Sequence, residues 1–560
     1  MPIDLMTKQG TELLSSRETP WNIYPRPQMR RDSYLNLNGQ WELTVDSVCR
    51  HIRVPFCPES RLSGLGQHFI EGSALCYRRR FVLPEGFNRG RVLLHIGAAD
   101  QIALVYINGH KACYHEGGYD SFTVDITDFL QTENELEIRC FDDLESKRFP
   151  YGKQTLTRGG MWYTPVSGIW QSVWLESVPE HYIQKLNIVN RGYSVTISAE
   201  PEMEGTVLIP GLGEYPLGST ITPEAPHLWS PEDPYLYDFT VKTAEDQVAS
   251  YFAIRCLEIK TVKGTPRLCL NGKPYFFHGL LDQGYWPDGL LTPAKPECYA
   301  EDILAMKKLG FNTLRKHIKV EPEEFYYQCD KLGMIVFQDM VNNGEYNFLR
   351  DTALPTVGIQ RLPDQGLNND PSVRKMFLQC MERTVKQLKN HPCICYWTIF
   401  NEGWGQFDSN RVYQLFRELD DTRFIDTTSG WFRGRNTDVD SRHIYFNQWW
   451  QLKKGKKPVV LSECGGLTYP VEGHIFNPDN AYGYKTCKSA EALSSGILEL
   501  YRKNLLPAIQ KKGLCAAIYT QVSDVEDEIN GILTYDRAVC KIDEDAMAAI
   551  AKELQNAIEG

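Results

Sequence analysis

The chain has 560 residues, more than one hydrophobic core usually supports, so we expect two to four domains. Hydrophobic residues make up 42% of the chain and charged residues 23%, which are ordinary values for a globular protein. The net charge of −11 and the pI near 5.7 argue against nucleic acid or an anionic membrane surface as a partner.

The cysteines and the first residues indicate where the protein works. Sixteen cysteines are scattered without a C-x-x-C pair. Cys393 and Cys395 alternate in a predicted strand, but no second cluster completes a zinc site, so we expect reduced thiols, no metal and no cofactor. The N-terminus lacks an apolar signal core, and no apolar run of about 18 residues follows. A cytoplasmic location without a membrane segment is therefore expected.

The first half of the chain reads as β-structure. Short alternating runs such as 40–45 and 103–107 predict a sugar-binding-like β-sandwich of jelly-roll type over residues 1–180. Asn108-Gly109 between two such runs is a strong hairpin signal. Further short strands among many prolines and glycines predict an immunoglobulin-like β-sandwich over residues 181–262.

From about residue 263 the pattern changes to strands that alternate with amphipathic helices, which is typical of βα units. The strand-like runs are residues 275–278, 311–315, 334–337, 393–400, 424–427, 443–446, 459–461 and 516–520. Eight strands in just under 300 residues predict a C-terminal (β/α)8 TIM barrel over residues 263–560.

Two of these runs end on a carboxylate. Glu402 follows the fourth strand and Glu463 the seventh, and the carboxyl ends of barrel strands face the catalytic mouth. Cleavage of a glycosidic bond usually needs two carboxyl groups, one on each side of the sugar: an acid for the leaving oxygen and a second group for the anomeric centre. Asn401 either donates to the sugar 2-hydroxyl or is a structural residue that closes its strand.

Four short motifs resemble signatures of one enzyme family. They are LNGQW at 37–41, SGIWQ at 167–171, FNE at 400–402 and SE at 462–463. In this order they resemble family 2 glycoside hydrolases, which include β-galactosidases, β-glucuronidases and β-mannosidases. The resemblance extends from about residue 20 to 560 and implies the domain order jelly roll, immunoglobulin-like sandwich, barrel.

The resemblance also implies catalytic roles. Glu402 would be the general acid/base and Glu463 the nucleophile of a retaining double displacement. Arg315 at the end of the second strand is the best candidate for a cation beside the nucleophile, with a salt bridge elsewhere as its alternative. Tyr445 would donate to the nucleophile, and His443 shares its face of the sixth strand.

Weaker candidates for sugar contacts lie at other strand ends. Asp282 could form a wall of the sugar pocket, and Trp404 and Trp431 either stack on sugars or belong to the core. Three polar residues follow strand eight: Gln521, Asp524 and Glu526. For each of them, contact with a sugar hydroxyl and a structural role are equally open.

Departures from the family pattern bear on the sugar. Where glucuronidases carry an Asn-x-Lys element that grips the sugar carboxylate, this chain has Glu528 and Asn530, and an added Glu would repel a uronate. Lys316 and Lys319 could serve an acidic sugar by another route. We therefore expect an exo-acting hydrolase for a neutral, galactose-like sugar in a small oligosaccharide or glycoside. The sequence leaves open a monomer or a homo-oligomer.

Three alternatives stay open. The first is a β-glucuronidase and the second a mannoside or pentofuranoside hydrolase of the same family. The third, from a different class, is a non-catalytic carbohydrate-binding protein. The presence of both carboxylates argues against this third reading, because a dead enzyme tends to lose at least one.

Overall fold

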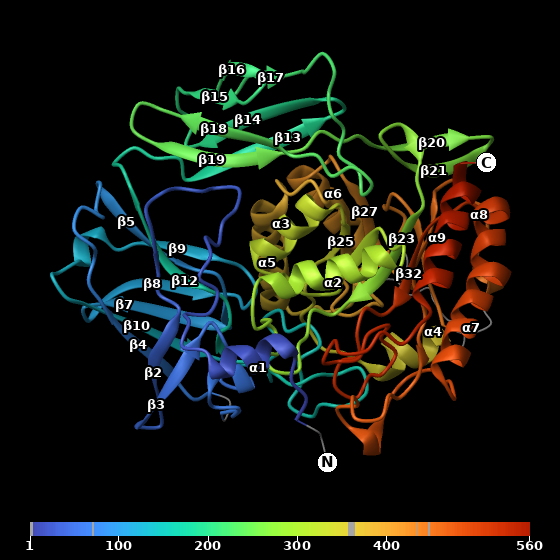
Figure 1. Ribbon diagram of the computed structural model, residues 1–560, viewed down its shortest axis with the longest axis horizontal. Helices are drawn as coiled ribbons and strands as arrows, with labels where there is room; N and C mark the ends of the chain where they lie inside the picture. Colours follow the sequence, from blue (N-terminus) through green and yellow to red (C-terminus); the bar gives the residue numbers. More distant parts are fainter. Residues whose placement is uncertain (1–3, 70–71, 357–363, 433, 446–448, 560) are drawn as a thin grey trace.

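The structure is a computed structural model, and it describes residues 4–69, 72–356, 364–432, 434–445 and 449–559. Three bodies follow one another along the chain (Figure 1): a blue β-sandwich, a green β-sandwich and a yellow-to-red barrel. β-Sandwiches followed by a C-terminal parallel barrel were predicted, and the prediction is confirmed.

The first sandwich packs two antiparallel sheets, in the orders β3-β2-β4-β10-β7-β8 and β1-β12-β5-β9, around one apolar core. Its strands are β1 Tyr34–Asn36, β2 Gly39–Val45, β3 Val48–Val54, β4 Leu75–Phe81, β5 Arg91–Ile96, β7 Ile102–Ile107, β8 His110–Glu116, β9 Phe122–Asp125, β10 Asn134–Phe141 and β12 Val173–Val178. The expected hairpin joins β7 to β8: Asn108 and Gly109 have φ of 51° and 80°, as a two-residue turn requires. A short pair, β6 Ala99–Asp100 and β11 Gly168–Ile169, and helix α1 Lys8–Ser15 complete this part.

The second sandwich has a three-stranded sheet, β13-β14-β17, and a four-stranded sheet, β16-β15-β18-β19. Alternate residues of these strands are buried, so that one face of each sheet contributes to a shared core. The strands are β13 Lys185–Arg191, β14 Ser194–Glu200, β15 Thr206–Ile209, β16 Gly213–Pro216, β17 Thr220–Ile221, β18 Tyr237–Lys242 and β19 Gln247–Phe252.

Eight parallel strands form the barrel, in the order β27-β26-β25-β24-β23-β32-β29-β28. They are β23 Phe277–Asp282, β24 Thr313–Lys316, β25 Ile335–Asp339, β26 Ile394–Asn401, β27 Phe424–Ser429, β28 Asp440–Ile444, β29 Val459–Gly465 and β32 Leu514–Thr520. The two ends of this order meet where the Ser429 hydroxyl lies 2.9 Å from His443 Nε2, so the barrel is closed. Every residue of β26, β27, β29 and β32 is buried, which explains their continuous apolar runs.

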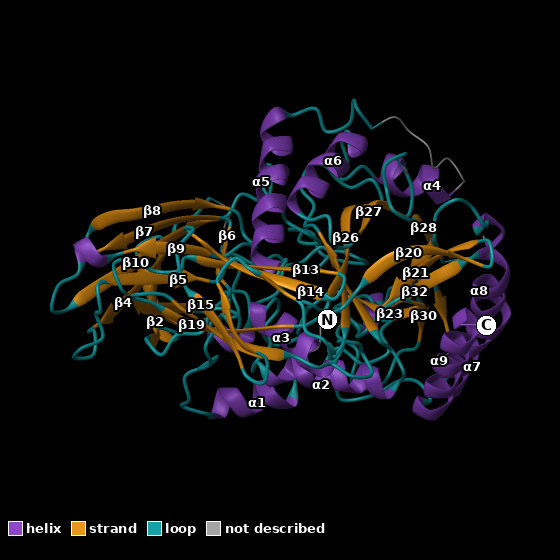
Figure 2. Cartoon of the chain, turned by 90° about the horizontal axis from the view of Figure 1, so that it is seen from above, coloured by secondary structure: helices purple, strands orange, loops and turns teal. Residues whose placement is uncertain are grey.

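Helices cover the outside of the barrel (Figure 2). They are α2 Glu297–Lys308, α3 Glu323–Leu332, α5 Pro371–Leu388, α6 Ser409–Leu419, α7 Ala490–Leu500, α8 Leu506–Lys512 and α9 Glu544–Glu559, with the single turn α4 Leu354–Thr356. All eight strands differ by a few residues from the bounds expected from the sequence, and two of these differences concern candidate site residues. β23 begins two residues later and ends on Asp282, and β28 ends at Ile444, one residue before Tyr445. The predicted sixth strand also included Phe446, which lies outside the described residues.

A small sheet joins the second sandwich to the barrel. It contains β20 Leu257–Val262, β21 Thr265–Leu270 and β22 Lys273–Pro274. Arg267 donates to the Leu514 carbonyl at 3.0 Å, so this sheet lies at the amino end of β32, away from the catalytic mouth. The expected domain limit at 262 falls at the turn between β20 and β21 and stays a proposal.

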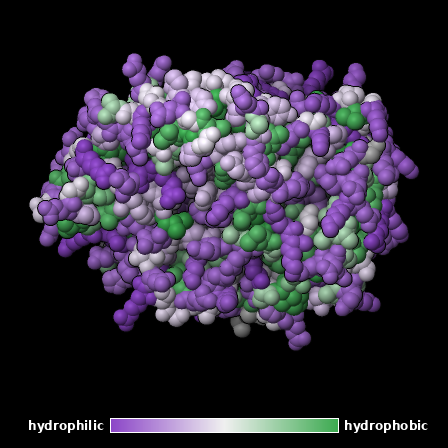
Figure 3. All heavy atoms as spheres, turned by 45° about the horizontal axis from the view of Figure 1, so that its top comes forward, coloured by the Kyte–Doolittle hydropathy of each residue, from purple (hydrophilic) through white to green (hydrophobic). Residues whose placement is uncertain are grey.

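The surface and the thiols complete the description. On the face drawn in Figure 3, hydrophobic atoms form small patches among hydrophilic ones. Within the described ranges no helix is both long enough and apolar enough to cross a membrane. All sixteen cysteines are free thiols.

Candidate active site

Glu402 stands at a tight turn directly after β26. Its φ is 52° and that of the following Gly403 is 80°, so two successive residues adopt the left-handed conformation. For a residue other than glycine this conformation is uncommon and is often found at functional sites. The Glu402 backbone is held on both sides: its N–H donates to Ser429 at 3.0 Å, and its carbonyl accepts from Trp431 Nε1 at 3.1 Å.

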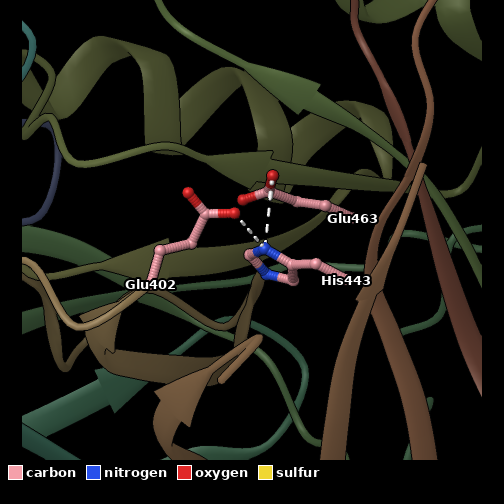
Figure 4. A group of neighbouring side chains, drawn as sticks. All are labelled: Glu402, His443 and Glu463. Carbon is pink, nitrogen blue, oxygen red and sulfur yellow. Dashed lines mark hydrogen bonds and ion pairs between the residues drawn. The ribbon is translucent and has the colours of Figure 1, made fainter. Parts of the chain in front are cut away.

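Glu463 approaches from the opposite side of the barrel on β29. The pairing of β29 with its neighbours is irregular near this residue, and His443 of β28 is its partner in register. Figure 4 shows both carboxylates pointing toward the His443 ring. One oxygen of Glu402, one of Glu463 and Nδ1 of His443 all lie within 4.8 Å of one another.

Arg315 at the carboxyl end of β24 organises the Glu463 side of this site. The guanidinium is fully buried and donates to Glu463 Oε1 and to the Ser462 carbonyl, both at 3.0 Å. It also pairs with Asp339, whose other contact is His317 Nδ1 at 2.9 Å. The Tyr445 hydroxyl donates to the second Glu463 oxygen.

These contacts act on the acidity of Glu463. Burial alone would raise its pKa, but the charges of His443, Arg315 and His317 and the hydrogen bond from Tyr445 lower it to about 2. Glu463 is therefore ionised at neutral pH. This is the state in which a carboxylate can attack a carbon centre.

Glu402 is shifted in the opposite direction. Burial raises the pKa of its carboxyl group, and the negative charge of Glu463 raises it further. His443 opposes both effects, because its Nδ1 lies 2.7 Å from Glu402 Oε1. Two residues of the same type thus have their pKa values shifted in opposite directions by their surroundings, as an acid and a nucleophile require.

Asn401, the last residue of β26, is held in one orientation. Its side-chain oxygen accepts from Arg315 at 2.9 Å. Arginine has no acceptor, so the amide oxygen must face Arg315, and the NH2 group is left to donate elsewhere. This arrangement provides a hydrogen-bond donor beside Glu402.

The same three carboxylate and imidazole groups could hold a metal ion. One ligand atom comes from each of Glu402, His443 and Glu463. These three atoms lie within 4.8 Å of one another, a spacing that a cation could bridge. Such an ion would occupy the oxygens of both carboxylates. His443 Nε2 is engaged separately with the Ser429 hydroxyl at 2.9 Å.

Comparison with known proteins identifies the family. The barrel matches the model for "Glycosyl hydrolases family 2, TIM barrel domain" over residues 261–539. The "Glycosyl hydrolase 2 galactose-binding domain-like" model matches residues 52–155, and the "Glycosyl hydrolases family 2" model matches residues 181–255. The chain belongs to glycoside hydrolase family 2.

Relatives of this family 2 chain carry different enzyme names. It is 23% identical over 438 residues to a beta-galactosidase of Thermoanaerobacter pseudethanolicus. It is 26% identical over 403 residues to the human beta-glucuronidase. The alignments cover 71% and 62% of this chain but 54% and 57% of those proteins, so the chain spans a little over half of their length.

Solved structures share the fold of this family 2 chain over nearly its whole length. The beta-D-glucuronidase of Dictyoglomus thermophilum has a TM-score of 0.76 at 18% identity, covering 95% of this chain and 98% of that one. A family 2 beta-galacturonidase of Eisenbergiella tayi bound to galacturonate has a TM-score of 0.69 at 17% identity, covering 95% and 99%. At these identities the likeness concerns the fold.

Several candidate residues of the family 2 chain meet at this site. Asn401, Arg315, Tyr445 and His443 all contact a carboxylate or one of its neighbours, as described above. His443 differs from the expected sugar contact in one respect: both of its ring nitrogens are engaged with protein groups. It is placed to position the carboxylates.

The two tryptophans lie beside the turn that carries Glu402. Trp431 holds the Glu402 carbonyl. Trp404 is 2% exposed and stacks on Trp162, with ring centroids 5.3 Å apart. Both rings are therefore largely covered by protein.

The other candidates are engaged in separate polar networks. Asp282 pairs with Lys316 at 2.7 Å, and Asp524 pairs with Lys541 at 2.7 Å. Gln521 donates to Asn530 at 2.8 Å, and Asn530 in turn donates to Glu528 at 2.9 Å. These contacts give Asp282 and Asp524 structural partners and link Gln521 to the loop after β32.

Sequence reasoning missed a whole wall of the site. The segment 142–167, between β10 and β11 of the first sandwich, reaches the barrel: Tyr151 N–H donates to the Asn342 carbonyl at 3.0 Å. Tyr163 donates from this segment to Glu528, and Trp162 covers Trp404. Its length without strand pattern was a usable signal, because long loops in compact domains are usually functional.

Proposed function

We propose that this chain is a retaining, exo-acting β-glycosidase that uses Glu463 as the nucleophile and Glu402 as the general acid/base. The proposal rests on one observation above all: oxygens of the two carboxylates lie within 4.8 Å of each other at the barrel mouth. Retaining enzymes hold their carboxyl groups about 5–5.5 Å apart and inverting enzymes about 6.5–9.5 Å. The short spacing leaves no room for a water between carboxylate and sugar.

The opposite pKa shifts support the same division of roles. In the first step ionised Glu463 attacks the anomeric carbon, the glycosidic C–O bond breaks, and the proton of Glu402 passes to the leaving oxygen. In the second step Glu402 takes a proton from water, whose oxygen attacks the anomeric carbon and releases Glu463. The sugar leaves with its original anomeric configuration.

Neighbouring groups would assist both steps. Arg315 and Tyr445 keep Glu463 ionised and oriented, and the Asn401 NH2 group is placed to donate to the sugar 2-hydroxyl, a contact that strengthens in the transition state. The segment 142–167 closes one side of the mouth, which favours attack on the end of a glycan.

We also propose domain limits at residues 180 and 262.

Two classes of sugar compete for this site. Relatives are named beta-galactosidase and beta-glucuronidase, so a neutral sugar and a uronate both have support. The sequence argument for a neutral sugar was the negative charge of Glu528. Both Glu528 oxygens accept hydrogen bonds from protein groups, one from Tyr163 and one from Asn530, which weakens that argument.

The roles are tested by replacing each carboxylate and measuring hydrolysis of 4-nitrophenyl glycosides. We expect Glu463→Gln to lower kcat by about 1,000-fold or more and Glu402→Gln by about 100- to 10,000-fold. Glu418→Gln, an exposed residue of α6, is the matched control and should keep the wild-type kcat. Full turnover by either active-site variant would contradict its role, and a wild-type chain that binds sugars without hydrolysing any would be a carbohydrate-binding protein.

A further inference from the structure

The first sandwich supplies an unusual lysine to the barrel mouth. Lys153 lies on the segment 142–167, and its carbonyl accepts from Tyr163 N–H at 3.0 Å. The residue is 6% exposed, and its ammonium lies 5.5 Å from the centroid of the Tyr163 ring. The neighbouring Gly152 packs against the carbonyl of Ile318, close to the end of β24.

Lys153 differs from the other buried lysines in lacking an anionic partner. Lys316 pairs with Asp282 at 2.7 Å, Lys319 with Glu321 at 2.9 Å and Lys541 with Asp524 at 2.7 Å. Within the part of the chain that the structure describes, the Lys153 ammonium forms no ion pair or hydrogen bond. Lysine side chains that are so little exposed are usually paired, so the Lys153 ammonium is expected to meet an anion that the protein itself does not provide.

The position of Lys153 indicates where that anion would lie. Tyr163, whose ring lies 5.5 Å from the ammonium, follows Trp162, and Trp162 stacks on Trp404, two residues after Glu402. The ammonium therefore lies on the side of the barrel mouth that carries Glu402. Tyr163, beneath the same ammonium, donates to Glu528, so this tyrosine links Lys153 to the loop after β32.

We propose that Lys153 is a specificity-determining residue that binds the carboxylate of a hexuronic acid at the sugar site. The inference rests on the glycosidase activity proposed above and names its substrate class as β-uronides. In this chain the cation comes from the first sandwich. In glucuronidases it comes from the Asn-x-Lys element of the barrel, where this chain has Glu528 and Asn530 instead. A neutral hexoside would leave the ammonium with only a hydroxyl as its acceptor.

The test compares kcat/KM for 4-nitrophenyl β-glucuronide, β-galacturonide, β-glucoside and β-galactoside. We expect the wild type to prefer a uronide over the neutral sugar of the same configuration. Lys153→Met should lower kcat/KM for the uronide by about 10- to 100-fold, the contribution of a charge-assisted hydrogen bond, and leave the neutral sugar nearly unchanged. Lys153→Arg, which keeps the charge, should retain the preference.

The matched control is Lys111→Met. Lys111 belongs to the same sandwich and also lies over a tyrosine ring, 5.6 Å from the centroid of Tyr114, but it is exposed and outside the barrel mouth. This variant should keep the wild-type kcat/KM on every substrate. A melting curve gives an independent readout, because removing a charge that has no partner in the protein should leave Tm unchanged or higher, whereas removing a structural ion pair should lower it.

The outcomes separate the two proposals. A wild type that hydrolyses a neutral sugar faster than either uronide, in a reaction that requires Glu463, overturns the role of Lys153 and leaves the double displacement intact. An equal loss on uronide and neutral sugar in Lys153→Met also overturns it. Hydrolysis that survives Glu463→Gln overturns the catalytic assignment itself.

Discussion

At the scale of single residues, the site depends on neighbours that give two glutamates opposite pKa shifts. Arg315 and Tyr445 surround Glu463 with donors, whereas Glu402 has burial and the charge of Glu463 acting against its ionisation. The pair and its donors could be expected from strand ends and family motifs. The contact of His443 with both carboxylates could not, because it depends on the local register of β28 and β29.

Tyr445→Phe tests how Glu463 is kept ionised. The hydroxyl donates to the ionised form and thus lowers the pKa of Glu463, so its removal should raise that pKa. The acidic limb of kcat/KM should move to higher pH, because Glu463 must be ionised, and kcat at neutral pH should fall about 10-fold. The alkaline limb, which reports Glu402, should move less.

The control for this variant is another tyrosine that donates to a carboxylate. Tyr413 donates to Asp438 at 2.8 Å on the outside of the barrel, and Tyr413→Phe should leave the pH profile unchanged. An unshifted acidic limb in Tyr445→Phe would show that this hydroxyl does not set the ionisation of Glu463.

At the scale of elements, the turn after β26 places Glu402. A Cβ at Gly403, where φ is 80°, would come within 2.4 Å of the Phe432 ring. Gly403→Ala should therefore displace Glu402 and lower kcat by at least about 10-fold, since small displacements of catalytic groups are costly. Kinetics and a melting curve on the same sample measure both effects.

Gly109→Ala separates backbone strain from displacement. Gly109 in the β7–β8 hairpin also has φ of 80°, but a Cβ there would meet nothing within 4 Å. This variant should lose about 1 kcal/mol of stability and keep the wild-type kcat. An equal loss of kcat in both variants would contradict the positional role of the turn after β26.

The elements also show what a sequence can and cannot predict. The barrel strands were predictable because buried parallel strands are continuous apolar runs that end at the mouth. Contacts between distant segments were not predictable, because Tyr163, which carries Lys153 over its ring, reaches Glu528 only through the docking of the first sandwich on the barrel. Asp282 and Asp524 end up with lysine partners for the same reason: the partner is chosen by packing.

At the scale of the whole molecule, the site is composite. The barrel contributes both carboxylates, and the first sandwich contributes the wall that carries Trp162 and Lys153. The second sandwich is anchored to the barrel by buried contacts, such as Tyr251 donating to Asp330 at 2.7 Å and Arg255 donating to the Ile394 carbonyl at 2.7 Å. Under the roles proposed above, domain docking links the residue that selects the sugar to the residues that cleave its bond.

The most direct test of the account is the mass of the protein after incubation with 2-deoxy-2-fluoro-β-glycosides of a uronic acid and of galactose, each with a good leaving group. The fluorine slows the breakdown of a covalent glycosyl–enzyme intermediate, so the predicted result is one sugar adduct on the peptide that contains Glu463. The adduct should be absent from Glu463→Gln. An adduct on another residue, or catalytic turnover of a natural glycoside with inversion at the anomeric carbon, would contradict the account.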